Sequence, residues 1–144
     1  MYWDTSAVLK LYAPEPDTPY YLQLIAAGGG PILSSAILSM ELLCAFHRKE
    51  SAGDLPRGGA LLALRQFHAD VGGGLIVTVP YGNDISTQAE RIVQAALGRR
   101  RSIMIRSLDL IHVASALVSK AESLVATDTR LREVARLAGL KLVP

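Results

Sequence analysis

The chain has 144 residues, of which 50% are hydrophobic and 19% are charged, and its formal net charge is +2. This length suits one domain with a substantial core, and the composition excludes a disordered chain. The mild positive charge fits a polyanionic partner without requiring one. The only cysteine, Cys44, excludes an internal disulfide framework and a cysteine-rich zinc site.

Three features lead us to expect a soluble cytoplasmic protein. A single cysteine suits a reducing compartment. The first residues, Met1 to Asp4, lack the basic region and the apolar segment of a signal peptide. The most apolar stretch, Ala36 to Phe46, is too short to span a bilayer and contains Glu41.

Short apolar runs alternate with helical patterns through the first half of the chain. Prolines at positions 14 and 16 end the first helical pattern, and a run of glycines at positions 28–30 ends the second. The predicted strands are 1–3 and 31–33, and the predicted helices are 5–13, 18–27, from Ser34 or Ser35 to about Lys49, and 54–70.

The same alternation continues through the second half. The clearest strand, Leu75 to Val79, is rich in β-branched residues and lies between three glycines and Pro80. Gly98 to Arg101 predicts a basic turn or loop. The other predicted strands are 124–127 and 141–143, and the other predicted helices are 84–97, 107–121 and 128–137.

Five strands separated by helices predict an α/β fold with a mainly parallel sheet that is covered on both faces. We therefore expect one three-layer α/β/α domain over residues 1–144, because no linker, repeat or low-complexity segment divides the chain. In sheets of this kind the ligand site lies beyond the carboxyl ends of the strands.

Four carboxylates are placed to meet at that edge of the sheet. Asp4 follows the first predicted strand and Asp128 follows the fourth. Glu41 and Asp109 fall in the first turn or two of helices that would begin at the same edge. The four side chains, which come from distant parts of the chain, are expected to converge.

Each carboxylate also has an ordinary structural interpretation. Asp4, Asp109 and Asp128 could each cap the start of a helix and favour the positive end of its dipole. Glu41 lies within an apolar stripe, too far into its helix for a simple cap, so its structural interpretation is an ion pair with Lys10 or an arginine.

Taken together, the four acids point to metal chemistry. Clustered carboxylates repel one another unless a cation compensates their charge. An all-oxygen donor set suits Mg²⁺ or Mn²⁺ better than zinc or copper, and such ions assist phosphodiester hydrolysis.

Five stretches carry motifs, in order along nearly the whole chain: Asp4 to Tyr12, Ser39 to Ala45, Ser107 to Ala116, Val125 to Leu131 and the ending Ala138 to Pro144. These stretches resemble the PIN-domain family and closely resemble its VapC-type toxins. The region from Gly53 to Arg106 carries little of this signal.

The resemblance implies a PIN fold and a hydrolase that cleaves RNA with Mg²⁺ or Mn²⁺. Asp4 and Asp109 would be the main metal ligands, followed by Asp128, while Glu41 would bind a second ion or act through water. Ser6 and Thr127 would be supporting hydroxyls, or else turn and capping residues. DNA remains an alternative substrate, because the same chemistry hydrolyses either phosphodiester.

The resemblance also implies partners: RNA, a homodimer mate and an antitoxin that blocks the acidic pocket, as in a type II toxin–antitoxin pair. The segment from Pro14 to Tyr21 and the helix from Ala36 to Phe46 are the candidates for exposed apolar contact area. We expect inhibition by an antitoxin that carries Arg or Lys to weaken with added salt.

Other residues have two interpretations each. Arg99, Arg100, Arg101 and Arg106 could contact phosphates or could form a solvated loop. His112, one turn after Asp109, is either close to the site or an ordinary core histidine, whereas His47 and His68 lack metal-ligand spacing with it.

The same residues argue against two other classes of protein. A haloacid-dehalogenase-type phosphotransferase needs a second aspartate at position 6, where this chain has Ser6. Gly28 to Gly30 lacks the spacing of a nucleotide-binding motif. The remaining alternative is a catalytically silent PIN-like module that binds RNA or protein without cleaving it.

Overall fold

Five parallel strands, in the order β3-β2-β1-β4-β5, form the central sheet of the protein, here a computed structural model that describes residues 1–100 and 103–144. Residue Tyr2 is in register with both Leu33 and Leu124, which places β1 at the centre. The predicted parallel sheet is confirmed. Its strands are β1 Tyr2–Trp3, β2 Ile32–Ser35, β3 Ile76–Val79, β4 Ser123–Val125 and β5 Lys141–Val143.

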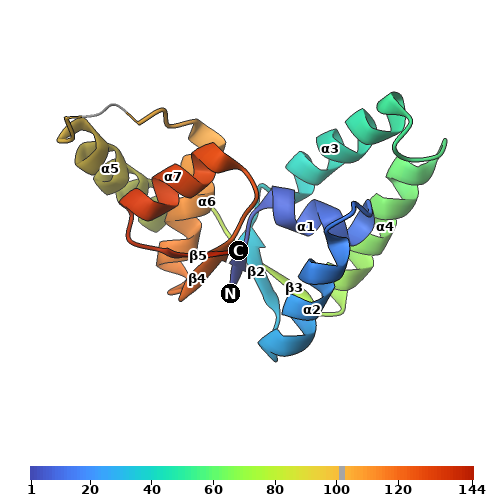
Figure 1. The fold of residues 1–144 in the computed structure, drawn as a ribbon. Coiled ribbons are helices and arrows are strands. Elements are labelled where there is room, and N and C mark those ends of the chain that lie inside the picture. The colour runs from blue at the N-terminus through green and yellow to red at the C-terminus, as the bar shows by residue number, and fades with distance from the viewer. Residues whose placement is uncertain (101–102) are drawn as a thin grey trace.

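Helices cover both faces of this sheet, as expected for three α/β/α layers (Figure 1). Helices α1–α4 lie on one side and α5–α7 on the other (Figure 1). The helices are α1 Thr5–Tyr12, α2 Thr18–Gly28, α3 Leu38–Ala52, α4 Gly59–Gly72, α5 Asn83–Leu97, α6 Ser107–Val118 and α7 Thr129–Leu137.

Alternate residues of the central strands feed two hydrophobic cores. Trp3 and Val125 pack with Phe46 and other side chains of α1–α4, whereas Tyr2 and Leu124 pack with side chains of α5–α7. Successive residues of a strand point to opposite faces, so the two-residue strand β1 contributes one large aromatic side chain to each core. Both aromatic residues are almost fully buried.

The predicted start of the third helix is wrong. Ser34 and Ser35 belong to strand β2, where they are in register with Thr78 and Val79, and α3 begins only at Leu38. The Ser34 hydroxyl donates to the Trp3 carbonyl oxygen across the sheet at 2.8 Å. A long-range contact therefore overrides the local preference of serine for a helix start.

The predicted helix from 54 to 70 also begins later than expected, at Gly59. The carboxylate of Glu50, at the end of α3, accepts hydrogen bonds from the backbone N–H groups of Gly58 and Ala60. This side chain satisfies free donors at the start of α4, so the preceding residues form a turn. Two other elements end earlier than predicted: α6 ends at Val118 instead of 121, and β4 ends at Val125 instead of 127.

Ion pairs hold the loop after helix α1 against the carboxyl-terminal end of that helix. The ammonium group of Lys10 is buried and pairs with Glu15 and with Asp17, at 2.8 Å from the latter. Lys49 of α3 also contacts Glu15 at 2.8 Å. Lys10 is thus committed to the loop after α1 and is not a partner of Glu41, contrary to one structural interpretation of that acid.

Large apolar side chains are exposed on several elements. On the two predicted contact segments, the exposed fractions are 68% for Met40, 45% for Leu43 and 39% for Tyr20. Leu61 and Leu62 of α4 are exposed as well. Within residues 1–100 and 103–144, no helix combines the length and apolarity needed to cross a membrane.

The turn after α7 gives a stability prediction. Gly139 has φ +82°, and the backbone N–H of Leu140 donates to the Ala135 carbonyl in the pattern that ends a helix with a left-handed residue. A Cβ at Gly139 would meet no atom within 4 Å, so only backbone strain opposes Gly139→Ala, and we expect it to lower the free energy of unfolding by about 1–2 kcal/mol. Urea denaturation measures this loss.

Gly72 provides the matched control. It lies in helix α4, has equally open space around its Cβ position and has no positive φ. Gly72→Ala is expected to be neutral or to stabilise the protein by up to about 1 kcal/mol. Equal effects of the two substitutions would contradict the strain argument.

Candidate active site

A cleft of about 710 Å³ lies at the edge of the sheet where β1 and β4 end. All four predicted acids line it, as does Ser6, whereas Thr127 reaches it only through Ser6. The lining residues are Asp4, Thr5, Ser6, Leu9, Met40, Glu41, Cys44, Ala45, Arg48, Arg106, Ser107, Leu108, Asp109, His112, Asp128 and Leu131.

Asp4 is the most deeply buried of the four acids, with 3% of its surface exposed. It caps helix α1 by accepting from the backbone N–H of Ala7 at 3.0 Å, so the capping interpretation is confirmed for this residue. Burial raises the pKa of Asp4 to about 6, although an interaction with His112 and hydrogen bonds from Ala7 and Ser6 oppose the shift. A nearby cation would therefore favour the charged form.

Ser6 links the first acid to the loop that precedes the fourth. Its hydroxyl donates to Asp4, with its oxygen 2.8 and 2.9 Å from the two carboxylate oxygens. The same oxygen accepts from the Thr127 hydroxyl at 2.7 Å and from the Thr127 backbone N–H at 3.0 Å. Ser6 and Thr127 thus tie the ends of β1 and β4 together beside the acids.

Asp128 is the exposed acid of the set. Its Oδ1 caps helix α7 by accepting from the backbone N–H groups of Arg130 and Leu131 at 2.8 and 3.1 Å. The capping interpretation is confirmed here too. Capping occupies Oδ1, and among the described residues no hydrogen-bond donor contacts Oδ2.

Asp109 is not a helix cap, because the N-cap of α6 is Arg106. Its Oδ2 atom is buried and has no hydrogen-bond partner among the described residues. Burial is the main cause of a raised pKa at Asp109, and the neighbouring charge of Asp128 adds to it. A buried carboxylate oxygen without a donor is costly, and a cation is a partner that would satisfy it.

Among the described residues, Glu41 pairs with His112 and not with Lys10 or an arginine. The His112 Nε2 atom lies 2.7 Å from Oε2 of Glu41, and the Thr5 hydroxyl donates to the same oxygen. Burial disfavours the charged form of Glu41, but its interactions with His112 and the hydrogen bond from Thr5 outweigh burial and lower its pKa. Glu41 is therefore held as a carboxylate.

The donor set of the cleft fits a hard divalent ion. It offers carboxylate oxygens from four segments, one of them buried and without a partner. Within residues 1–100 and 103–144, no three His, Cys, Asp or Glu side chains already stand at the spacing that holds a metal. Capping explains part of this spacing, since Asp4 and Asp128 are drawn toward their own helices.

Some of the cleft was not expected from the sequence. The sequence patterns did not predict that Thr5 and Arg48 would line the cleft. His112, for which two interpretations were open, is both a core residue and a contact of Glu41. Of the four predicted basic residues, Arg106 lines the acidic cleft, whereas Arg99 and Arg100 line a separate hollow between α5 and α6. Arg101 lies outside the described residues.

Comparisons with known proteins agree with this description. Residues 1–137 match the family model described as PIN domain. A crystal structure of VapBC2 from Rickettsia felis, bound to a DNA fragment from their promoter, contains a chain with a similar fold: the TM-score is 0.70 and the identity 16%, over 99% of this chain and 98% of that one. No curated protein sequence matches this chain. PIN domains are generally nucleases, and this chain belongs to the PIN-domain family.

Proposed function

We propose that this protein is a metal-dependent endoribonuclease and the toxin of a type II toxin–antitoxin pair. One observation carries the nuclease proposal: four carboxylates from separate segments line a single cleft at the carboxyl edge of the sheet. Membership of the PIN-domain family and the fold shared with a VapBC2 chain support it.

In this proposal Asp4, Asp109 and Asp128 hold Mg²⁺ or Mn²⁺, and Glu41 completes the site. When bound, such an ion supplies Lewis-acid chemistry: it orients a phosphate, activates water and offsets the charge that develops on the leaving oxygen. Hydrolysis adds the oxygen of water to phosphorus, breaks the bond to the leaving oxygen and returns a proton to that oxygen.

The residues of the chain itself prepare this site. Ser6 and the Ala7 backbone orient the Asp4 carboxylate. The buried oxygen of Asp109 has no donor among residues 1–100 and 103–144, so it is available to a cation. His112 and Thr5 keep Glu41 ionised, which suits it to accept a hydrogen bond from water.

Two arginines of the cleft are placed to bind the substrate backbone. Arg48 from α3 and Arg106 before α6 both line the cleft, and both are exposed. We expect Arg48→Ala and Arg106→Ala each to weaken the binding of a single-stranded RNA and to reduce the salt dependence of binding by about one phosphate contact. Fluorescence anisotropy at several salt concentrations, with Mg²⁺ replaced by EDTA, measures both quantities.

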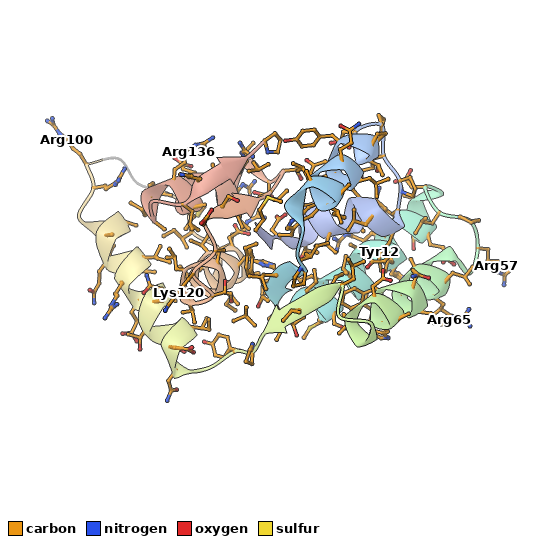
Figure 2. The ribbon with its side chains drawn as sticks, turned by 90° about the horizontal axis from the view of Figure 1, so that it is seen from below. Tyr12, Arg57, Arg65, Arg100, Lys120 and Arg136 are labelled. Carbon is orange, nitrogen blue, oxygen red and sulfur yellow. The ribbon has the colours of Figure 1, made fainter. Side chains whose placement is uncertain are left out.

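Arg65 provides the matched control for this binding experiment. It is exposed on α4 and projects away from the body of the molecule (Figure 2). Arg65→Ala removes the same charge outside the cleft, so we expect little change in RNA affinity. Equal losses for all three arginine variants would mean that binding follows net charge and not the cleft.

The partner proposal rests on exposed apolar area beside the cleft. Met40 lines the cleft and is 68% exposed, and Leu43 lies one turn along the same helix. A homodimer mate or an antitoxin in the cytoplasm would cover such side chains, and an antitoxin Arg or Lys could pair with the acids. Sedimentation at tens of micromolar tests the dimer, because a monomer at that concentration would refute it.

A module that binds RNA without cleaving it is the second candidate. The observation in its favour is that Asp4 and Asp128 already cap helices, and that the described acids do not stand at metal-holding spacing. Incubation of the purified, partner-free protein with total RNA in Mg²⁺, Mn²⁺ or EDTA separates the two. Sharp fragments that require metal support the nuclease, and bound but intact RNA supports the silent module.

A further inference from the structure

A chain of hydrogen bonds runs from the hydrophobic core to the acidic cleft. The Tyr2 hydroxyl lies 2.8 Å from Nδ1 of His112, whose Nε2 lies 2.7 Å from Oε2 of Glu41. Tyr2 and His112 are 0% and 2% exposed. Their rings meet edge to face, with centroids 5.9 Å apart and planes inclined by 76°. The imidazole is therefore clamped between a core phenol and a cleft carboxylate.

The chemistry of these groups determines which group donates each hydrogen bond. A phenol keeps its proton at neutral pH, so the Tyr2 hydroxyl can donate it to Nδ1 of His112, 2.8 Å away. When it donates to Nδ1, a neutral imidazole carries its hydrogen on Nε2, which faces the Glu41 carboxylate. The opposite tautomer would turn a lone pair toward the negative carboxylate.

The contacts of Glu41 are confined to one of its two oxygens. The Thr5 hydroxyl donates to Oε2, and Nε2 of His112 contacts the same oxygen. Among the described residues, no donor contacts Oε1, although Glu41 lines the cleft. The carboxylate thus presents one occupied oxygen and one free oxygen.

We propose that Tyr2 and His112 are positioning residues that fix Glu41 so that Oε1 alone acts in the cleft, with the Tyr2 hydroxyl setting the His112 tautomer. In this role Tyr2 acts through His112, and His112 acts through Glu41. This inference rests on the proposed nuclease function and assigns to Glu41 a role through a single oxygen, on water or a cation. Partners of this kind typically change activity or metal affinity by about 10–100-fold when removed.

The tautomer can be read without any measurement of cleavage. Nitrogen-15 NMR of the metal-free protein, with the imidazole signals of His112 assigned by comparison with His112→Gln, distinguishes hydrogen on Nε2 from hydrogen on Nδ1 or on both. We expect hydrogen on Nε2 alone in the wild type and a mixture of tautomers in Tyr2→Phe. Hydrogen on Nδ1 in the wild type would overturn the inference, whether or not the protein cleaves RNA.

Kinetics then separate positioning from packing. Tyr2→Phe keeps the ring that fills the core and removes only the hydroxyl, so the melting temperature checks the fold. We expect kcat to fall about 10–100-fold with KM little changed. His112→Gln, which can still offer a donor to Oε2, should retain more activity than His112→Leu, and equal losses in these two variants would overturn the positioning role.

Tyr81→Phe is the matched control for the lost hydroxyl. Tyr81 is exposed and its hydroxyl lies 3.0 Å from that of Ser86, outside the cleft. Its kcat should equal that of the wild type. Full activity in Tyr2→Phe, beside an active wild type, would contradict the inference, whereas an inactive wild type would refute the proposed function and leave the tautomer measurement as an independent test.

Discussion

Asp109→Asn is expected to abolish RNA cleavage while leaving the fold intact. The amide is nearly isosteric with the carboxylate but lacks the charge that would hold a divalent ion. Because removal of residues that merely support metal ligands typically costs about 10–100-fold, loss of a direct ligand should reduce kcat/KM by more than about 100-fold. Asp109 serves no capping role, so helix α6 should form as before.

Single-turnover cleavage of a defined RNA in saturating Mn²⁺ measures this loss, and circular dichroism checks the fold. The control is Asp84→Asn, which removes the same charge from an exposed position in the first turn of α5. That variant should cleave like the wild type. Retained cleavage by folded Asp109→Asn would move the metal site away from this residue.

In the metal-free protein, the contribution of Asp4 to the free energy of unfolding is expected to fall as the pH rises from about 4 to above 6. Burial raises the pKa of Asp4 to about 6, from 3.8 for the unperturbed group. The folded state therefore binds the proton more tightly than the unfolded state, and ionisation above the folded pKa costs about 3 kcal/mol. This contribution to stability is present below pH 4 and lost as the pH rises through 6.

Asp4→Asn cannot ionise and still offers an oxygen to cap α1. The stability of the variant relative to the wild type should therefore increase by about 2.5 kcal/mol between pH 4 and pH 7.5 in EDTA, as measured by urea denaturation. Added Mn²⁺ should stabilise the wild type more than the variant, because only the wild type presents this carboxylate to the ion. Parallel pH profiles of the two proteins would contradict this prediction, because they would show that folding does not raise the pKa of Asp4.

Local sequence patterns were sufficient to predict the five strands and their parallel arrangement. Alternation of apolar runs with helical patterns depends on burial, which hydrophobic spacing reports directly. The predicted helix boundaries are wrong where a contact between residues distant in sequence determines them. Ser34 remains in the sheet because it donates to the Trp3 carbonyl, and α4 starts late because Glu50 caps it. Neither partner is visible from neighbouring residues alone.

The candidate site could also be predicted only in part from the sequence. The positions of the four acids relative to the predicted strands and helices placed all of them at one edge, and they line one cleft. Which acid also caps a helix could not be decided from the sequence, since Asp4, Asp109 and Asp128 all occur near helix starts and only Asp109 is not a cap. The partner of Glu41 is His112, 71 residues away in sequence, and only the fold, which brings α3 and α6 to the same cleft, places the two in contact.

The central claim is that these acids form one divalent-cation site, and a crystal structure with bound Mn²⁺ tests it most directly. Anomalous scattering would locate the ion without reference to activity. We predict Mn²⁺ in the cleft, in contact with carboxylate oxygens of Asp4 and Asp109, with the free oxygen of Asp128 turned toward it. An empty cleft at saturating Mn²⁺, in crystals of protein that cleaves RNA in solution, would contradict the claim.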